Sequence, residues 1–438
     1  MTGHSQTFDA RQQAELNSAF AAAVSAHQAG ELERAVNGYR RLLEHLPDHP
    51  ELHERLGIAL QQRDAGEQAI GHLRRARELD PDNPAYRVNL ALALDSQGDY
   101  HLALEESQKA LERWPEHPAL WFNAGTELRM LDRYGEAVSA FSEVLELTPD
   151  NIGALVNRAV CLHRLEKDDQ AASDFEKALA AQPRDPRVLN NFANFLQDTG
   201  NPERARQLLE EAVRMAPDNE EARGNLAVVM MQAGDFASAA ACLRQAGETA
   251  RPAIDHLAWQ AVSGVETHAG FADDLLDFDR LVMELRPFGA TSDEACNELN
   301  RALSGFVCDH PTRRYEPASK TTRHGYQTLN LVRESNSAIR QLVDSIRHAV
   351  DTYLASHPVD ARHPWLRWRP QRWSLNVWAT ILERGGHQNP HIHPGGYLSG
   401  VYYAQVPEQT EPQDAEAGWI EFGTPPAEFP CMERHPSR

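Results

Sequence analysis

Apolar positions follow two different periods along the chain and divide it into two parts. As far as residue 253, apolar and small residues recur at helical spacing between short polar breaks. One such stretch carries Leu102, Ala103, Leu104, Ser107 and Ala110. After Pro252 this register ends, and the chain becomes richer in Trp, His, Pro and β-branched residues. The pattern predicts an all-helical first part and a second part that mixes helix and strand.

The first part is an internal repeat with a period of 34 residues. Proline recurs at Pro47, Pro81, Pro115, Pro149, Pro183 and Pro217. A small residue recurs at Ala23, Gly57, Ala91, Gly125, Ala159, Ala193 and Ala227. Alanine recurs at Ala35, Ala69, Ala103, Ala137, Ala171, Ala205 and Ala239. Small residues allow paired helices to approach closely, and each proline ends the second helix of a pair.

These positions predict about seven two-helix units over residues 16–253. Asp-Asn or a similar pair follows most of the prolines and can cap the next helix. Residues 1–15 form an N-terminal segment, and residues 254–285 are expected to be a helical cap or linker. The period and its small and proline positions resemble the tetratricopeptide repeat family. The resemblance implies a right-handed superhelix whose concave groove binds a protein or peptide. An array that only spaces or oligomerises other parts is the alternative.

Asparagine repeats in the same register, two residues before the small position. The set is Asn89, Asn123, Asn157, Asn191 and Asn225. In this repeat family the position lies on the first helix of each pair and faces the groove. The array is similar to the repeats of O-linked N-acetylglucosamine transferases, which hold peptides through such a ladder of carboxamides. The resemblance implies a peptide-binding role for the five residues, although asparagine is also common here in arrays with no known peptide ligand.

The second part combines one strong helix with predicted strands. After Asn336 or Ser337 as cap, apolar residues follow helical spacing at Ile339, Leu342, Val343, Ile346, Val350 and Leu354. Residues 372–382 alternate, with Trp373, Leu375, Val377, Ala379 and Ile381 on one face. Two further strands are predicted at 397–406 and 418–422. The densest histidine cluster of the chain lies between the first two strands, at 385–394.

His391 and His393 are the pair that could carry chemistry. On an extended backbone, residues i and i+2 point to the same face, so both imidazoles can bind one metal ion. A third protein ligand would be needed, and with a carboxylate among the three the site would be the facial triad of non-haem iron oxygenases. The other interpretation is two surface histidines in a turn.

Three segments, 309–328, 373–407 and 418–426, resemble a family of 2-oxoglutarate/Fe(II)-dependent oxygenases that bacteria sometimes fuse behind tetratricopeptide repeats. The motif HIHPGGYLSGVYY at 391–403 is its most specific part. The resemblance covers about 276–438 and implies a domain over 286–438 with a double-stranded β-helix, or jelly-roll, core. It implies Fe(II) and 2-oxoglutarate as cofactors, with His391 as a metal ligand and His393 in place of the usual aspartate.

By strand position, Asn376 and Tyr403 are candidates to line the cosubstrate pocket, whereas Trp378 is expected in the core. His324 and Arg323 are expected in a loop that closes over the site or lies at the surface. The family also uses a distal His and an Arg on later strands, for which the chain offers only His435 and Arg438. We therefore expect the oxygenase-like domain to be C-terminally incomplete.

A cupin is a further alternative for the second part. Gly385, five further residues and then His391 and His393 fit the opening of a cupin motif. No glutamate follows at the spacing that a cupin requires. This lowers the cupin interpretation, although the barrel would be similar.

Composition narrows the partners and the compartment. The chain has 438 residues and a net charge of −21, which argues against unaided binding to nucleic acid or anionic lipid. No run reaches eighteen apolar residues, and the N-terminus lacks the features of a secretory signal. Five scattered cysteines without a CxxC pair argue against a disulfide scaffold or a cysteine zinc site. These features predict a soluble, cytoplasmic protein and leave its oligomeric state open.

Together the two halves predict a Fe(II)/2-oxoglutarate-dependent dioxygenase, an oxidoreductase that hydroxylates its substrate. Its repeats would bind a protein or peptide, either as partner or as substrate. The alternative is a protein-binding scaffold with a non-catalytic, degenerate oxygenase-like domain.

Overall fold

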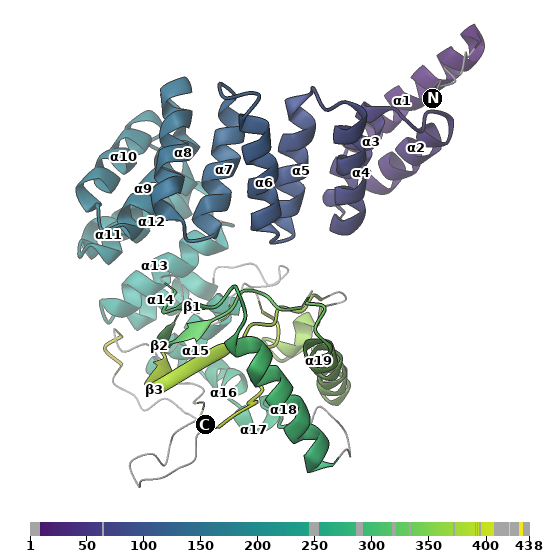
Figure 1. Ribbon diagram of the computed structural model, residues 1–438. Coiled ribbons are helices and arrows are strands. Elements are labelled where there is room, and N and C mark those ends of the chain that lie inside the picture. The colour runs from purple at the N-terminus through teal and green to yellow at the C-terminus, as the bar shows by residue number, and fades with distance from the viewer. Residues whose placement is uncertain are drawn as a thin grey trace. The chain divides into compact units, whose positions relative to one another are not determined.

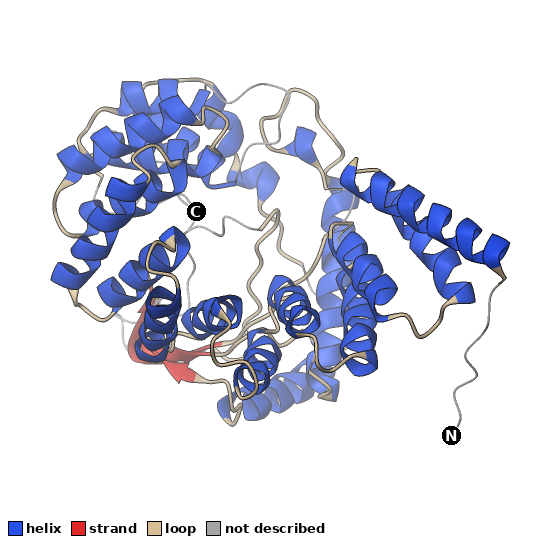
Figure 2. Cartoon of the chain, turned by 90° about the horizontal axis from the view of Figure 1, so that it is seen from above, coloured by secondary structure: helices blue, strands red, loops and turns tan. Residues whose placement is uncertain are grey.

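The computed structural model describes residues 9–63, 65–244, 254–285, 292–317, 321–332, 334–370, 373–389, 391, 393, 396–406, 420 and 429–431. The chain divides into two compact units, Met1–Pro183 and Arg184–Arg438. Figures 1 and 2 show the helices that dominate both units and the small sheet of the second.

The first unit consists of helices in antiparallel pairs. They are α1 (Ala10–Gln28), α2 (Leu32–His45), α3 (Pro50–Gln61), α4 (Gly66–Leu79), α5 (Pro84–Ser96), α6 (Tyr100–Leu111), α7 (Pro118–Met130), α8 (Tyr134–Leu147), α9 (Ile152–Arg164) and α10 (Asp168–Ala181). Each helix packs against its neighbours in sequence. The first helices of successive pairs also touch, α3 with α5, α5 with α7 and α7 with α9. This confirms the predicted array of two-helix units.

Local sequence explains where these helices start and stop. The second helix α4 ends at Leu79, two residues before Pro81. The following helix α5 begins with a proline at its first position, and the Asn83 side chain accepts a hydrogen bond from the Ala85 N–H. Asn151 caps α9 in the same way. The prolines and the Asp-Asn pairs therefore act as the sequence predicts.

The repeated small residues lie where two helices come closest. A Cβ added to Gly57 would lie 2.6 Å from Leu73 Cγ, and one added to Gly125 would lie 2.8 Å from Phe141 Cε1. The repeated alanines are fully buried, at 0% exposure. This group comprises Ala35, Ala69, Ala103, Ala137, Ala171, Ala205 and Ala239. Close approach of the paired helices is therefore built into each unit.

The second unit begins with two more helix pairs and continues with shorter helices. The pairs are α11 (Pro186–Asp198) with α12 (Pro202–Met215), and α13 (Glu220–Gln232) with α14 (Phe236–Arg244). They are followed by α15 (Ile254–Glu266), α16 (Phe271–Leu275) and α17 (Phe278–Leu281). Helix α15 packs on α13 and α14. Near the end of the chain, the Phe429 ring packs on Trp259 of α15, with centroids 5.7 Å apart.

The remainder of the second unit is a small sheet beside two helices, α18 (Asp293–Cys308) and α19 (Ser337–Ser356). Asn336 caps α19, as predicted, by accepting from the N–H groups of Ala338 and Ile339. The antiparallel sheet has the order β1 (Arg314–Tyr315), β2 (Thr322–Gln327), β3 (Thr380–Gln388). Strand β2 pairs with β3 from Gln327 opposite Thr380 to Thr322 opposite Gln388, with an irregularity between Arg323 and Gly325.

Several strand predictions were wrong. Residues 373–379 and 397–406 form no regular strand. Strand β3 instead runs through residues 385–388, where a glycine-rich turn was predicted. Residues 322–327 were expected to be a loop and form strand β2. The alternation at 375–379 reflects burial and not strand pairing, because this stretch makes only isolated backbone hydrogen bonds among the described residues, such as Leu331 N–H to Val377 O at 2.6 Å. The predicted strand at 418–422 lies outside the described residues except for Ile420, which is in no strand. The described part of the chain therefore holds a three-stranded antiparallel sheet.

None of the helices in the described ranges is both long and apolar enough to cross a membrane.

Replacing glycine by alanine should have opposite effects on the free energy of unfolding at two helical positions. Gly125→Ala should lower the free energy of unfolding by about 1–3 kcal/mol, because the new methyl group would overlap Phe141. Gly71→Ala, inside α4, should raise it by about 0.5–1 kcal/mol, because no atom lies within 4 Å of the added Cβ. Urea unfolding measures both. Equal effects at the two sites would contradict the packing described here.

Candidate functional site

The chain that precedes the histidine cluster has two different faces. Leu375, Val377, Ala379 and Ile381 pack against the buried residues of α18 and α19. Trp378 alternates with them, is 39% exposed and therefore lies on the other face. Burial of the odd-numbered residues thus decides which side chains remain available beside the cluster.

His391 and His393 lie next to each other in the structure. Their ring centroids are 4.8 Å apart and the rings are nearly perpendicular, at 81°. His391 Nδ1 lies 2.8 Å from the carbonyl oxygen of Asn389, to which it donates a hydrogen bond. This bond leaves Nε2 of a neutral His391 ring with its lone pair, the form that binds metals. The ring of His393 also contacts Trp378, with centroids 5.4 Å apart.

The histidine segment begins where β3 ends. Gln388 is the last residue of the strand and pairs with Thr322, and the Asn389 N–H donates to Thr321 O at 3.0 Å. The carbonyl that accepts from His391 thus belongs to a residue held against the sheet.

The fit to a metal ion is incomplete within the described residues. A facial triad requires three protein ligands. Among the residues that the structure describes, no group of three or more His, Cys, Asp or Glu side chains could hold a metal ion. The described site therefore supplies two imidazoles, and His435 and Arg438 lie outside the described residues.

The other residues predicted for this site occupy different environments. Asn376 is exposed, and its Oδ1 accepts a hydrogen bond from Asn330 Nδ2 at 2.9 Å. Tyr403 is 42% exposed, and desolvation raises the pKa of its hydroxyl group. No hydrogen bond or ring contact in the described residues connects either of them to the histidines. The structure thus brings His391 and His393 together and leaves Asn376 and Tyr403 separate from them.

Two expectations for neighbouring residues need correction. Trp378 was expected in the core, but it is exposed and contacts His393, because its neighbours Val377 and Ala379 take the buried face. Arg323 and His324 were expected in a loop and instead belong to β2. In the sequence, only the aromatic side chain of Trp378 pointed to a place beside the histidines. An aromatic residue is equally expected in the core, so the sequence did not distinguish the two positions.

The repeated asparagines of the first unit use their amide groups in three ways. Asn89 Nδ2 donates to Glu54 Oε1 at 2.8 Å, which links α5 to α3. Asn157 Nδ2 donates to Gly153 O of its own helix at 2.9 Å. Asn123 is 8% exposed, and its Nδ2 has no hydrogen-bond partner among the residues that the structure describes.

The two asparagines of the second unit are also bonded through their amide groups. Asn191 Nδ2 donates to Arg187 O at 2.8 Å, and Asn225 Nδ2 donates to Asn190 Oδ1 at 2.8 Å. With these bonds made, the side-chain oxygen is the group through which these residues can accept a hydrogen bond.

A carboxyl group is buried at one position of the repeat core. Glu127, at 1% exposure, occupies the position that other repeats fill with Ala59, Ala93, Cys161, Phe195 or Val229. Ser107 likewise replaces a large residue, which elsewhere is Tyr39, Leu73, Phe141, Phe175, Leu209 or Leu243. The Ser107 hydroxyl donates to Glu127 Oε1 at 3.1 Å. The two substitutions therefore place a hydroxyl group and a carboxyl group in contact inside the core.

Because its helices form pairs that repeat every 34 residues, the chain is a helical-repeat protein. Family models of the tetratricopeptide repeat match residues 26–93 and 196–262, and residues 88–152. A model of YpiA-like C-terminal tetratricopeptide repeats matches residues 154–219. The chain is therefore a tetratricopeptide-repeat protein. Residues 376–436, which include both histidines, match the family described as "Putative 2OG-Fe(II) oxygenase".

Solved structures that resemble the chain are repeat proteins. Yeast Tom70 is 18% identical with a TM-score of 0.49, over 71% of this chain and 68% of its own. Pseudomonas aeruginosa pilF is 25% identical with a TM-score of 0.40, over 48% of this chain and 96% of its own. A thermophilic repeat protein of Thermus thermophilus is 20% identical with a TM-score of 0.38, over 42% of this chain and 100% of its own. No curated protein matches the chain.

The buried carboxyl group predicts a pH dependence of stability. Desolvation raises the pKa of Glu127 from 4.5 to about 8, so the folded chain keeps a proton that the unfolded chain releases. Between these values stability should fall as pH rises, by at most about 1.4 kcal/mol per pH unit. Glu127→Gln should remove this part of the dependence and stabilise the protein more at pH 8 than at pH 5.

Thermal or urea unfolding across this pH range tests the prediction. The matched control is Glu143→Gln, which changes an exposed glutamate of the neighbouring helix α8. If both variants had the same pH profile, Glu127 would be ionised in the folded protein.

Proposed function

We propose that this protein is a Fe(II)/2-oxoglutarate-dependent oxygenase whose repeats bind a protein or peptide. The observation that carries the proposal is the adjacent pair His391 and His393, with centroids 4.8 Å apart, inside the segment that matches the oxygenase family. The bond from His391 Nδ1 to Asn389 O supports the same role, since a metal-binding histidine usually donates its second N–H to a carbonyl or carboxylate.

In this proposal the two imidazoles supply two of three protein ligands. His391 would bind through Nε2, and His393 would take the position at which the family usually has aspartate. In enzymes of this class, bound Fe(II) and 2-oxoglutarate would allow O₂ to act as the oxidant. The chain contributes the orientation of its histidines: Asn389 fixes one ring, and Trp378 packs against the other. Asn376 and Tyr403 remain candidates to line the cosubstrate pocket, and a jelly-roll core remains part of the proposal for this domain.

The repeat array would provide the partner site. Within the second unit, the carboxamide oxygens of Asn191 and Asn225 can accept hydrogen bonds from the backbone N–H groups of an extended peptide. In the first unit, the carboxamide oxygen of Asn157 offers the same acceptor. Contacts to backbone would make such binding tolerant of peptide sequence. The proposed compartment remains the cytoplasm.

A protein-binding scaffold is the second candidate function. It is favoured by the two-ligand set, because the described residues bring no third metal-binding side chain to the histidines. In that case the sheet and its two helices would have a structural role.

Spectroscopy separates the two candidates. Under anaerobic conditions, adding Fe(II) and 2-oxoglutarate to the full chain should produce a visible charge-transfer band. His391→Ala and His393→Ala should each abolish the band. His387→Ala is the matched control and should retain it, because His387 belongs to β3 and lies opposite Arg323. A flat spectrum for the wild-type chain would favour the scaffold.

Peptide selection tests the repeat groove. We expect random peptides displayed on phage to be enriched on the full chain, and the double variant Asn191→Ala/Asn225→Ala to bind the enriched peptides about tenfold more weakly, the cost of about 1.4 kcal/mol in lost hydrogen bonds. Asn37→Ala is the control, since Asn37 is exposed on a second helix, α2. Failure to enrich any peptide would favour an array that spaces or oligomerises.

A further inference from the structure

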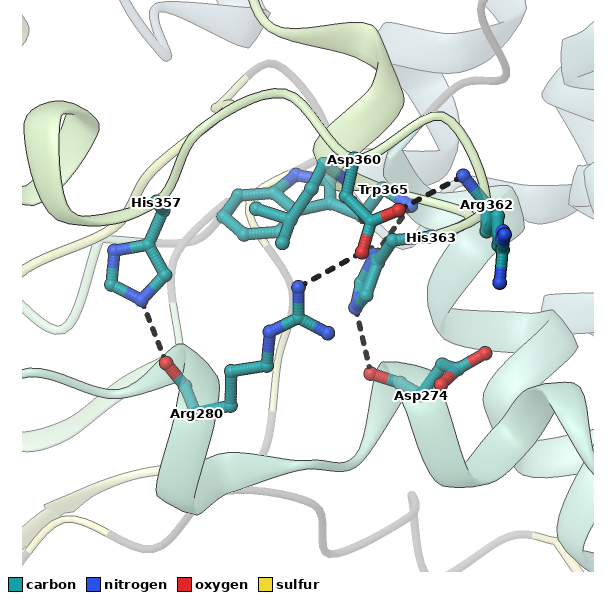
Figure 3. A network of polar contacts seen from close by, with 8 residues as sticks. Asp274, Arg280, His357, Asp360, Arg362, His363 and Trp365 are labelled. Carbon is teal, nitrogen blue, oxygen red and sulfur yellow. Dashed lines mark hydrogen bonds and ion pairs between the residues drawn. The ribbon is translucent and has the colours of Figure 1, made fainter.

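A polar network fixes the chain segment that follows α19. His363 is 2% exposed, and its Nε2 donates to the carbonyl oxygen of Asp274 in α16 at 3.0 Å. Its Nδ1 accepts from the backbone N–H groups of Trp365 and Leu366, both at 3.1 Å. Burial lowers the pKa of His363, in keeping with a neutral ring that donates at one nitrogen and accepts at the other. Figure 3 shows this histidine between its partners.

Two further contacts hold the same segment to α17. Arg280 forms an ion pair with Asp360 at 3.0 Å, and its carbonyl oxygen accepts from His357 Nε2 at 2.7 Å (Figure 3). The hydrogen bond from Arg280 lowers the pKa of the Asp360 carboxyl group. Residues 357–366 are thereby fastened to α16 and α17 through both backbone and side chains.

Trp365 connects this network to the histidine pair. Its backbone is held by His363, and its ring stacks on Tyr397 with centroids 4.8 Å apart and an angle of 24°. Tyr397 follows His393 by four residues, and the Gly396 N–H donates to His393 O at 2.9 Å. A displacement of Tyr397 would therefore be passed to His393 through its neighbour Gly396 and this hydrogen bond.

The histidine segment is thus held at both ends. Before His391, the Asn389 N–H bonds to Thr321 O of the strand region. After His393, the Tyr397 ring is stacked on Trp365. Gly396 lies between His393 and Tyr397, and a glycine has many backbone conformations to lose, so an anchor is needed to keep the two imidazoles adjacent.

We propose that the Trp365–Tyr397 stack is the positioning element that holds His391 and His393 side by side. Neither aromatic residue needs to touch a ligand for this role. The consequence for metal binding rests on the proposed function, whereas the order of the histidine segment can be measured independently.

The test compares Tyr397→Ala with Tyr397→Phe in the full chain. Hydrogen–deuterium exchange should rise across the amides of 391–397 in Tyr397→Ala and stay at the wild-type level in Tyr397→Phe, which keeps a ring for stacking. Titration with Co(II) alone, as a spectroscopic probe, should show about tenfold weaker binding for Tyr397→Ala, the effect typical of residues that orient metal ligands. Thermal unfolding of each variant verifies that the rest of the unit remains folded.

A double-mutant cycle provides the second line of evidence. Trp365→Ala should raise exchange at 391–397 as Tyr397→Ala does, and the double variant should add little, because both changes remove one stack. Additive effects, or unchanged exchange in Tyr397→Ala, would overturn the proposal. If the wild-type chain failed to bind Co(II) while the exchange results held, the metal site of the proposed function would be wrong and the positioning role would stand.

Discussion

The close approach of paired helices is the constraint on which the repeat array depends. A small residue on the first helix of a pair faces a large residue sixteen positions later on the second, as Gly57 faces Leu73 and Gly125 faces Phe141. A large side chain at the small position would push the helices apart and shift the surface on which the next pair rests. Because each unit buries its apolar face only against its neighbours, an error in one pair would affect the packing of the next. The fully buried alanines on the second helices show the same limit.

Ser107 and Glu127 place polar groups inside this close-packed core. The serine occupies a position at which other repeats have a large apolar side chain, and its hydroxyl bonds to the glutamate of the following unit. A charged carboxylate at 1% exposure would be costly, so burial raises the pKa of Glu127 and favours its protonated form. The core of the array therefore contains a titratable group.

Sequence-based prediction succeeded where a structure depends on residues close together in the chain, and it failed where the partners are far apart. The repeat helices, the proline stops and the Asn336 cap depend on residues a few positions apart, and all were predicted. Strand β2 depends on pairing with β3 across more than fifty residues, and its polar, glycine-containing sequence gives no local sign of this partner. The alternation at 375–381 did identify the buried face correctly, but burial against α18 and α19 does not require a continuous ladder. At the site, the His391–His393 pair follows from spacing alone, whereas the roles of Trp365 and Tyr397 depend on contacts that no motif encodes.

The histidine pair and the repeated asparagines have one feature in common, a side-chain N–H that donates to a nearby backbone carbonyl. His391 ties Nδ1 to a backbone carbonyl, and Asn157 and Asn191 tie their amide nitrogens to carbonyls of their own helices. At His391 the internal bond leaves a neutral ring with a lone pair on its other nitrogen. At each asparagine it uses one of the two amide N–H bonds and leaves the carbonyl oxygen and the second N–H for another molecule. The backbone carbonyl therefore selects one function of the histidine, whereas at the asparagines it orients the carboxamide.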